Sequence, residues 1–343
     1  MRTLLNTLYV TNPEAYVSRD GENVVIKIDN KEALRRPIHI LENIVCFNYV
    51  GISPGLMKLC VDNNVGVSFL NEYGRFMARV SGKVKGNVLL RRTQYRYADE
   101  IEKSLEISKN CITGKLVNCR NVVSRSIRDH EDVVDSDKMR FVLEKLSVSL
   151  ENVKNATNID ELRGIEGEAA RNYFSIFDNF ILKQKEDFYF TERSKRPPMD
   201  NLNALISFAY TLLANDMESA LETVGLDPYV GFMHTDRPGR ISLALDMIEE
   251  LRPYIAERFV ISLINKKQIS PKGFIKKESG GIIMDKDTKS IFLTAWQKRK
   301  QEVITHPFLN EKIEIGLIPY VQAMLLARYL RNDIDSYPPF FMR

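Results

Sequence analysis

The pattern of apolar residues changes near residue 86. Before that point, apolar residues form short runs rich in β-branched and aromatic side chains and separated by turn signals, a pattern typical of β-strands. These runs lie at 23–29, 38–47, 65–70 and 76–80. Between them, Ser53-Pro54 predicts the start of a short helix, because serine caps helix N-termini and proline favours the first helical turn. We expect a small, mostly antiparallel sheet.

After residue 86, apolar residues recur three and four positions apart, which predicts helices. The expected helices span 88–128, 136–156, 159–183, 200–222, 242–265, 287–302 and 314–332. Pro253 is expected to kink the helix that contains it, and the Lys- and Gly-rich segment 266–285 is expected to be a loop. The fold class is therefore α+β, with a β-rich domain over 1–86 and a larger all-α domain over 87–343.

Composition is that of an ordinary globular protein, with 44% hydrophobic and 27% charged residues among 343. The net charge of +4 is small, so a nucleic-acid surface must come from local clustering of basic residues. Four cysteines without a C-x-x-C pair argue against a zinc site and suit a reducing cytoplasm. Neither a signal-like segment nor a long apolar stretch is present, so we expect neither secretion nor a membrane span.

Three segments of the C-terminal half carry side chains that can bind a metal ion. Glu166 lies between Gly164 and Gly167, and His234 lies in a Gly- and Pro-rich loop. Glu249 follows Asp246 by three residues, so both acids project from one helix face. Two carboxylates and an imidazole suit Mg²⁺ or Mn²⁺, and the imidazole favours Mn²⁺ relative to an all-oxygen site.

Each of these signals also has a purely structural explanation. The two glycines could mark a tight contact between helices, and a single histidine is more often structural than a ligand. Arg252 could neutralise Glu249 as an ordinary i, i+3 ion pair. Only the combination of the three segments favours a metal site.

Basic residues cluster at the boundary of the two expected domains. We expect DNA contacts from Lys83, Lys85, Arg91, Arg92 and Arg96 there, although a solvated helix face would look the same. Arg171, Tyr173 and Arg196 are further candidates for DNA contacts near the proposed metal site, and Arg193 and Lys195 lie beside Arg196 in the sequence. Such residues hold phosphates without reading sequence, so binding should weaken steeply as salt increases.

Several motifs recur in the order found in one family. They are Leu162-Arg-Gly-Ile-Glu-Gly167, Arg196-Pro-Pro-Met-Asp200, Gly225-Leu-Asp-Pro228 with Gly231-Phe-Met-His234, Ser242–Pro253 and Tyr337-Pro-Pro-Phe340. From residue 160 onward the chain resembles the CRISPR-associated integrase of spacer acquisition, the Cas1 family. The resemblance implies a metal site made of Glu166, His234 and Glu249, with Asp246 as a supporting acid.

The resemblance further implies an endonuclease and integrase that joins short foreign DNA duplexes into a CRISPR repeat array. Their 3′-hydroxyl ends would attack phosphodiesters of the array by transesterification. It also implies a homodimer, a small partner protein (Cas2) and a prokaryotic cytoplasm. We expect the dimer surface in the β-rich domain, because exposed strand edges invite pairing. Two alternatives remain open: a stand-alone metal-dependent nuclease on branched or damaged DNA, and a non-catalytic DNA-binding scaffold.

Overall fold

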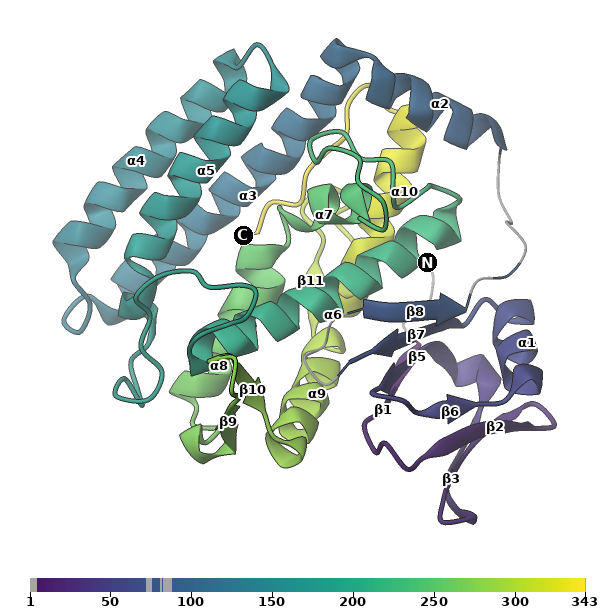
Figure 1. Ribbon diagram of the computed structural model, residues 1–343. Coiled ribbons are helices and arrows are strands. Elements are labelled where there is room, and N and C mark those ends of the chain that lie inside the picture. Colours follow the sequence, from purple (N-terminus) through teal and green to yellow (C-terminus); the bar gives the residue numbers. More distant parts are fainter. Residues whose placement is uncertain (1–4, 72–75, 81, 83–87, 343) are drawn as a thin grey trace. The chain divides into compact units, whose positions relative to one another are not determined.

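The computed structural model describes residues 5–71, 76–80, 82 and 88–342, which form two compact units. The first unit contains residues 1–85 together with 289–302, and the second contains 86–288 and 303–343. The fold is α+β as predicted, with an N-terminal sheet region followed by a largely helical region (Figure 1). The return of 289–302 to the first unit differs from the predicted boundary, which assigns all residues after 86 to the second.

The first unit contains two four-stranded sheets in the described residues. One has the order β1-β5-β7-β8, formed by Asn6–Val10, Leu41–Phe47, Gly66–Leu70 and Phe76–Val80. The other has the order β4-β3-β2-β6, formed by Lys31–Pro37, Asn23–Ile28, Tyr16–Asp20 and Gly51–Ile52.

Both sheets mix parallel and antiparallel pairs, so the expectation of a mostly antiparallel arrangement was wrong. β1, β5 and β7 are parallel, as are β2 and β6. Between β5 and β7 the chain passes through helix α1 (Pro54–Asp62), and such a crossover brings the next strand back in a parallel direction.

The core of the first unit is apolar and lies between these elements. Val17, Ile44, Leu56 and Val67 are fully buried in it. Helix α1 begins as the sequence predicts, because the Ser53 side chain accepts a hydrogen bond from the Leu56 amide at 3.2 Å. All four cysteines are free thiols and are buried.

The second unit begins with helices that the sequence predicts only in part. The expected helix 88–128 divides into α2 (Val88–Asp99) and α3 (Ile101–His130), whereas the expected weak point, Gly114, lies inside α3. A Cβ atom at Gly114 would lie 2.7 Å from Cβ of Glu250, so this glycine permits a close approach. α4 (Ser136–Asn155) and α5 (Ile159–Ser175) follow and pack beside α3 (Figure 1).

The remaining helices frame the C-terminal half of the second unit. α6 (Asn201–Val224) is capped by Asp200 and ends at Gly225, whose φ of 90° is left-handed. The expected kink at Pro253 is a π-helical turn, Arg252–Glu257, between α7 (Ser242–Ile248) and α8 (Arg258–Asn265). α10 (Ile318–Leu330) completes the second unit, whereas α9 (Lys286–Lys300) lies mostly in the first unit.

Two short hairpins interrupt the region expected to be all α-helical. β9 (Phe274–Lys276) pairs with β10 (Ile282–Met284) inside the expected loop 266–285. β11 (Val303–Thr305) pairs with β12 (Lys312–Glu314). Runs of three residues are too short to give a distinct alternating pattern, which explains why the sequence did not reveal them.

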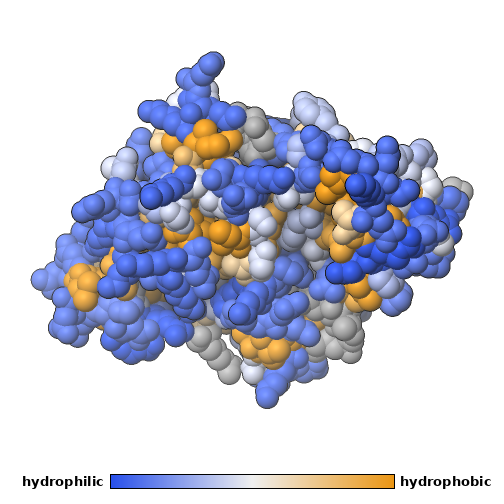
Figure 2. All heavy atoms as spheres, turned by 90° about the horizontal axis from the view of Figure 1, so that it is seen from below, coloured by the Kyte–Doolittle hydropathy of each residue, from blue (hydrophilic) through white to orange (hydrophobic). Residues whose placement is uncertain are grey.

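Surface polarity agrees with the ordinary composition. Hydrophilic side chains cover most of the face in Figure 2, and apolar side chains form separate small groups on it. Among the described residues, we find no helix with the length and apolar character needed to cross a membrane.

Candidate active site

Helices α3, α5 and α7 bring two of the predicted acids, Glu166 and Glu249, to the ammonium group of Lys115. Nζ of Lys115 on α3 donates a hydrogen bond to Oε1 of Glu166 on α5. The same Nζ lies 2.8 Å from Oε2 of Glu249, which follows the last residue of α7. Nη1 of Arg252 lies 2.5 Å from the other oxygen of Glu249. The ion pair expected as the structural explanation for Glu249 is therefore present, together with a link to Glu166.

Electrostatics keep Glu249 ionised although its residue is only 3% exposed. Burial raises the pKa of a carboxyl group, but the charges of Arg252 and Lys115 outweigh it and hold the pKa of Glu249 at about 2. Burial likewise lowers the pKa of Lys115, and Glu249 and Glu166 raise it above its ordinary value. These three residues thus form a charged group inside the second unit.

Asp246 holds the loop that carries His234. Its Oδ2 accepts hydrogen bonds from the amides of Phe232 and Met233 at 2.7 and 3.0 Å, and its Oδ1 accepts one from the His234 amide at 3.0 Å. Oδ1 also lies 2.5 Å from Nδ1 of the His234 imidazole. A proton on Nδ1 satisfies this contact and leaves Nε2 with the lone pair that a metal ligand requires.

Further contacts fix the same loop, and the sequence reasoning missed them. Nε of Arg163 donates to the carbonyl oxygen of Met233 at 3.0 Å, and Oγ of Ser104 donates to that of Phe232 at 2.8 Å. A Cβ atom at Gly231 would lie 2.8 Å from Oδ2 of Asp246, so only glycine fits there. Arg163 and Gly231 lie in the family motifs, which is the only sequence signal that could have found them.

The residue types fit a hard divalent cation, although a lysine ammonium group now occupies the place that the metal ion would take. Among the residues described, no group of three or more His, Cys, Asp or Glu side chains lies close enough together to hold a metal ion. Instead, the ammonium group of Lys115 joins Glu166 to Glu249, and His234 faces Asp246. Because these two acids already share a cation, Mg²⁺ or Mn²⁺ could replace the ammonium group between them, with Nε2 of His234 as the third donor.

The two glycines that flank Glu166 do not mark a helix–helix contact. A Cβ atom at Gly164 would meet no described atom within 4 Å, and one at Gly167 would meet only the end of Arg171, at 4.0 Å. The alternative explanation, a tight contact between helices at these glycines, is therefore wrong. Gly164 is exposed on α5, and Gly167 is partly exposed.

The predicted DNA contacts have different surroundings. Arg92, Arg96, Arg171 and Arg196 are exposed, whereas Lys83 and Lys85 lie outside the described residues. Arg91 is partly buried, and its Nε donates to the carbonyl oxygen of Gly225 at 3.2 Å. Tyr173 is only 2% exposed, and its ring packs against Phe174, Phe177 and Phe180. This burial in an aromatic cluster contradicts the predicted DNA contact of Tyr173.

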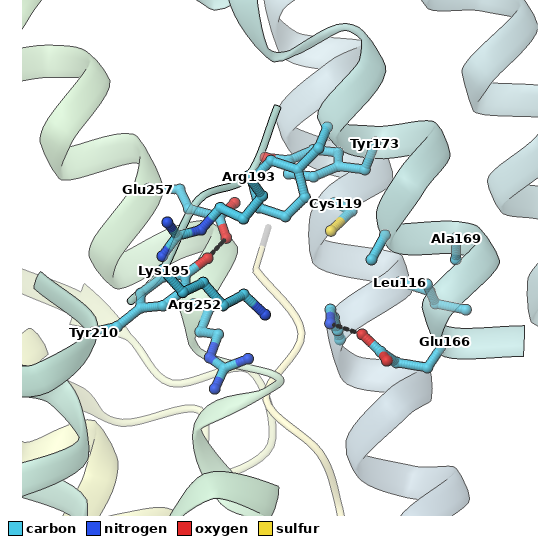
Figure 3. Close-up of a pocket in the computed structure, with 13 residues that line it drawn as sticks. Leu116, Cys119, Glu166, Ala169, Tyr173, Arg193, Lys195, Tyr210, Arg252 and Glu257 are labelled. Carbon is cyan, nitrogen blue, oxygen red and sulfur yellow. Dashed lines mark hydrogen bonds and ion pairs between the residues drawn. The ribbon is translucent and has the colours of Figure 1, made fainter. Parts of the chain in front are cut away.

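A pocket of about 60 Å³ adjoins the acidic site. Figure 3 shows Lys195 and Arg252 on one side of it and Glu166 on the other. Burial raises the pKa of Glu257, which accepts a hydrogen bond from the hydroxyl of Tyr210 at the end of the pocket away from Glu166. The other lining residues are Lys115, Leu116, Cys119, Ala169, Ala170, Tyr173, Phe174 and Arg193.

The fold occurs in known structures. A Cas1 protein from Thermotoga maritima matches with a TM-score of 0.82 over 98% of this chain and 100% of that chain, at 21% identity. A casposase bound to an integration product matches with a TM-score of 0.85 over 99% of this chain and 95% of that chain, also at 21% identity. At this level of identity the likeness establishes the fold class alone.

Sequence comparison establishes the family. Residues 8–298 match the family described as CRISPR associated protein Cas1. A CRISPR-associated endonuclease Cas1 from Chlorobaculum tepidum is 49% identical over the full length of both chains. Another from Rhodospirillum rubrum is 44% identical, also over the full length of both chains. The chain belongs to the Cas1 family, as the resemblance of its motifs indicated, and its bacterial relatives are named endonucleases.

Proposed function

We propose that this protein is a metal-dependent DNA integrase of CRISPR spacer acquisition, which can also cleave DNA. It would join short foreign duplexes, through their 3′-hydroxyl ends, to a repeat array. The observation that carries the proposal is the pair of acids, Glu166 and Glu249, held on one cation beside a histidine whose Nδ1 is engaged. Family membership and the name endonuclease of the relatives support it.

The proposed reaction exchanges one phosphodiester for another. The 3′-oxygen of the incoming strand forms a bond to phosphorus, the bond from phosphorus to the 3′-oxygen of the target strand breaks, and the proton of the attacking hydroxyl passes to solvent or to the departing oxygen. When bound, Mg²⁺ or Mn²⁺ would polarise the phosphoryl oxygen and stabilise charge on the attacking and leaving oxygens. The number of phosphodiesters is conserved, so no energy-rich cofactor is needed.

The chain's own residues would prepare this site. Glu166, Glu249 and Nε2 of His234 would hold the ion, and Asp246 would fix the orientation of the imidazole. Arg252 would keep Glu249 ionised and in place. Exposed Arg171 and Arg196 would hold DNA phosphates nearby.

Strand transfer by the wild type and two variants tests this proposal. Glu166→Gln removes a proposed ligand, and Glu168→Gln changes an exposed acid two residues along the same helix. With Mn²⁺, a labelled duplex with free 3′-hydroxyl ends and a repeat-containing plasmid, we expect joined product from the wild type and Glu168→Gln but none from Glu166→Gln.

The same assay separates the other candidate functions. Shortened strands without joined product would mean hydrolysis by a stand-alone nuclease, with water in place of the 3′-hydroxyl. Binding without any covalent product at any divalent metal concentration would mean a DNA-binding scaffold. Either result would overturn the proposal.

We also propose that the protein acts as a homodimer with a small Cas2 partner in the cytoplasm of a prokaryotic cell. Strand β8 is a candidate dimer edge, because it ends its sheet and exposes 49% of Phe76 and 40% of Met77. The edge strand β4 of the other sheet carries Lys31, Glu32, Arg35 and Arg36, and such charged residues disfavour pairing.

A further inference from the structure

The pocket beside Glu166 has more positive than negative groups on its walls. Lys115, Arg193, Lys195 and Arg252 contribute positive charges, whereas Glu166 and Glu257 are the acids among the lining residues. Glu249 does not line the pocket, but it pairs with Lys115 and Arg252 and offsets part of their charge. Burial raises the pKa of Glu257, which favours its neutral form. A small anion in the pocket would relieve the repulsion among the cations.

Three of these cations are held by the protein itself, and Lys115 is the one that pairs with Glu166 and Glu249. Nη1 of Arg193 lies 2.6 Å from Oδ1 of Asn203, and Nη2 lies 3.1 Å from Oγ of Ser207. Arg252 pairs with Glu249. Both guanidinium groups also lie over the ring of Tyr210, at 5.4 and 4.8 Å from its centre. These contacts fix the two arginines and account for their presence without a ligand.

Lys195 differs from its neighbours because its side chain has neither a hydrogen bond nor an ion pair within the described part of the chain. The residue as a whole is exposed, which leaves it accessible to a ligand from solvent. Burial of its ammonium end, with the adjacent charges of Arg252 and Arg193, lowers its pKa. The side chain extends toward the side of the pocket where Glu166 lies (Figure 3).

The size of the pocket limits what could bind there. Its volume of about 60 Å³ is well below the roughly 300–1,000 Å³ of pockets that enclose drug-sized ligands. It therefore has no room for a base or a nucleoside. A single phosphoryl group approaching from the open side is the anion that the charge and the size both suit.

We propose that Lys195 binds a non-bridging oxygen of a DNA phosphate next to the acidic site. The inference rests on the proposed function, because it takes DNA as the source of the phosphate. Lys195 would then be a substrate-binding residue, and the fixed guanidinium groups of Arg252 and Arg193 would maintain a positive potential around it. Because the adjacent charges of Arg252 and Arg193 repel Lys195, we expect the protein to fold without it.

Stability and DNA binding together separate this role from a structural one. Lys195→Ala removes like-charge repulsion, so its melting temperature should equal or exceed that of the wild type. Loss of one hydrogen bond to a charged group should weaken binding and strand transfer roughly tenfold to a hundredfold. Lys195→Arg should recover part of the loss. Lys138→Ala, which removes an exposed cation from α4, should change neither quantity.

The contacted phosphate can be located with duplexes that each carry one methylphosphonate, which removes the negative charge of one phosphate. At one position, the substitution should weaken binding by the wild type and by Lys138→Ala, but not by Lys195→Ala. The salt dependence of binding should also decrease by about 0.9 in slope for Lys195→Ala. Equal sensitivity of the wild type and Lys195→Ala at every position, or a lowered melting temperature, would overturn the inference.

Strand transfer by the wild type and by Lys195→Ala distinguishes an error in the role of Lys195 from an error in the proposed function. If the wild type joins DNA and Lys195→Ala joins it equally well, only the assignment of Lys195 is wrong. If the wild type joins no DNA with any divalent metal, the integrase proposal fails, and the binding measurements still decide whether Lys195 contacts a phosphate.

Discussion

The carboxylate of Asp246 lies 2.5 Å from Nδ1 of His234 and also accepts the backbone amide of His234. One buried side chain, 1% exposed, thus fixes both the path of the loop and the rotation of the imidazole. The resemblance implies that Asp246 is a supporting acid but does not say which groups it contacts. Its four hydrogen-bonding contacts favour the supporting role.

Asp246→Asn should therefore disrupt the loop that carries His234 more than helix α7, which carries Asp246. The asparagine amide group is a donor and cannot accept hydrogen bonds where a carboxylate oxygen does, so at least one buried contact is lost. We expect the free energy of unfolding to decrease by about 1–3 kcal/mol and strand transfer to fall below detection, measured by chemical denaturation and by product formation. Unchanged strand transfer would show that His234 does not depend on this carboxylate.

Lys115 should compete with the metal ion for Glu166 and Glu249. Lys115→Met leaves these acids with one fewer partner, and loss of one member of a buried ion pair costs about 3–5 kcal/mol. We therefore expect a lower melting temperature without metal and a larger increase on addition of Mn²⁺ than in the wild type. Lys138→Met serves as the control. A Mn²⁺-induced increase equal to or smaller than that of the wild type would contradict the competition.

Gly164 should matter for DNA and not for packing. Gly164→Ala places a methyl group in open space on an exposed helix and should stabilise the protein by about 0.5–1 kcal/mol. If a DNA backbone approaches α5 at Gly164, the same methyl group should weaken DNA binding. Gly55→Ala, at another open helical glycine, should leave DNA binding unchanged. Denaturation and fluorescence anisotropy give the two quantities, and unaltered binding by Gly164→Ala would exclude such an approach.

The edge of β8 can be tested by placing a charge on it. Phe76→Asp should convert a dimer into a monomer, because an unpaired charge opposes burial of the strand edge. Light scattering after size exclusion measures the mass. Arg36→Asp on β4 should leave the mass of the dimer unchanged, and a dimeric Phe76→Asp protein would place the dimer contact elsewhere.

Local patterns predicted individual elements better than the contacts between them. The run 23–29 contains β3 (Asn23–Ile28), and Asp200 and Gly225 bound α6 as their residue types indicate. The division after Asp99 and the parallel pairing of β1 with β5 depend on contacts between distant segments. For the same reason, the pattern could not place residues 289–302 with the first unit.

In the candidate site, too, contacts between distant segments could not be predicted from local patterns. Glu166, His234, Asp246 and Glu249 could be selected from motifs, because acids and a histidine near glycines are distinctive. Lys115 could not, since it is one of 49 basic residues and lies in an ordinary helical pattern. Its role becomes visible only when α3 places it between α5 and the end of α7.

Anomalous diffraction from crystals grown with Mn²⁺ tests the central claim most directly, since it locates the ion independently of activity. The account predicts one strong peak bonded to Glu166, Glu249 and Nε2 of His234, with the Lys115 ammonium group displaced from between the two acids. Absence of a peak at saturating Mn²⁺, or a peak elsewhere with Lys115 still bound to both acids, would contradict it.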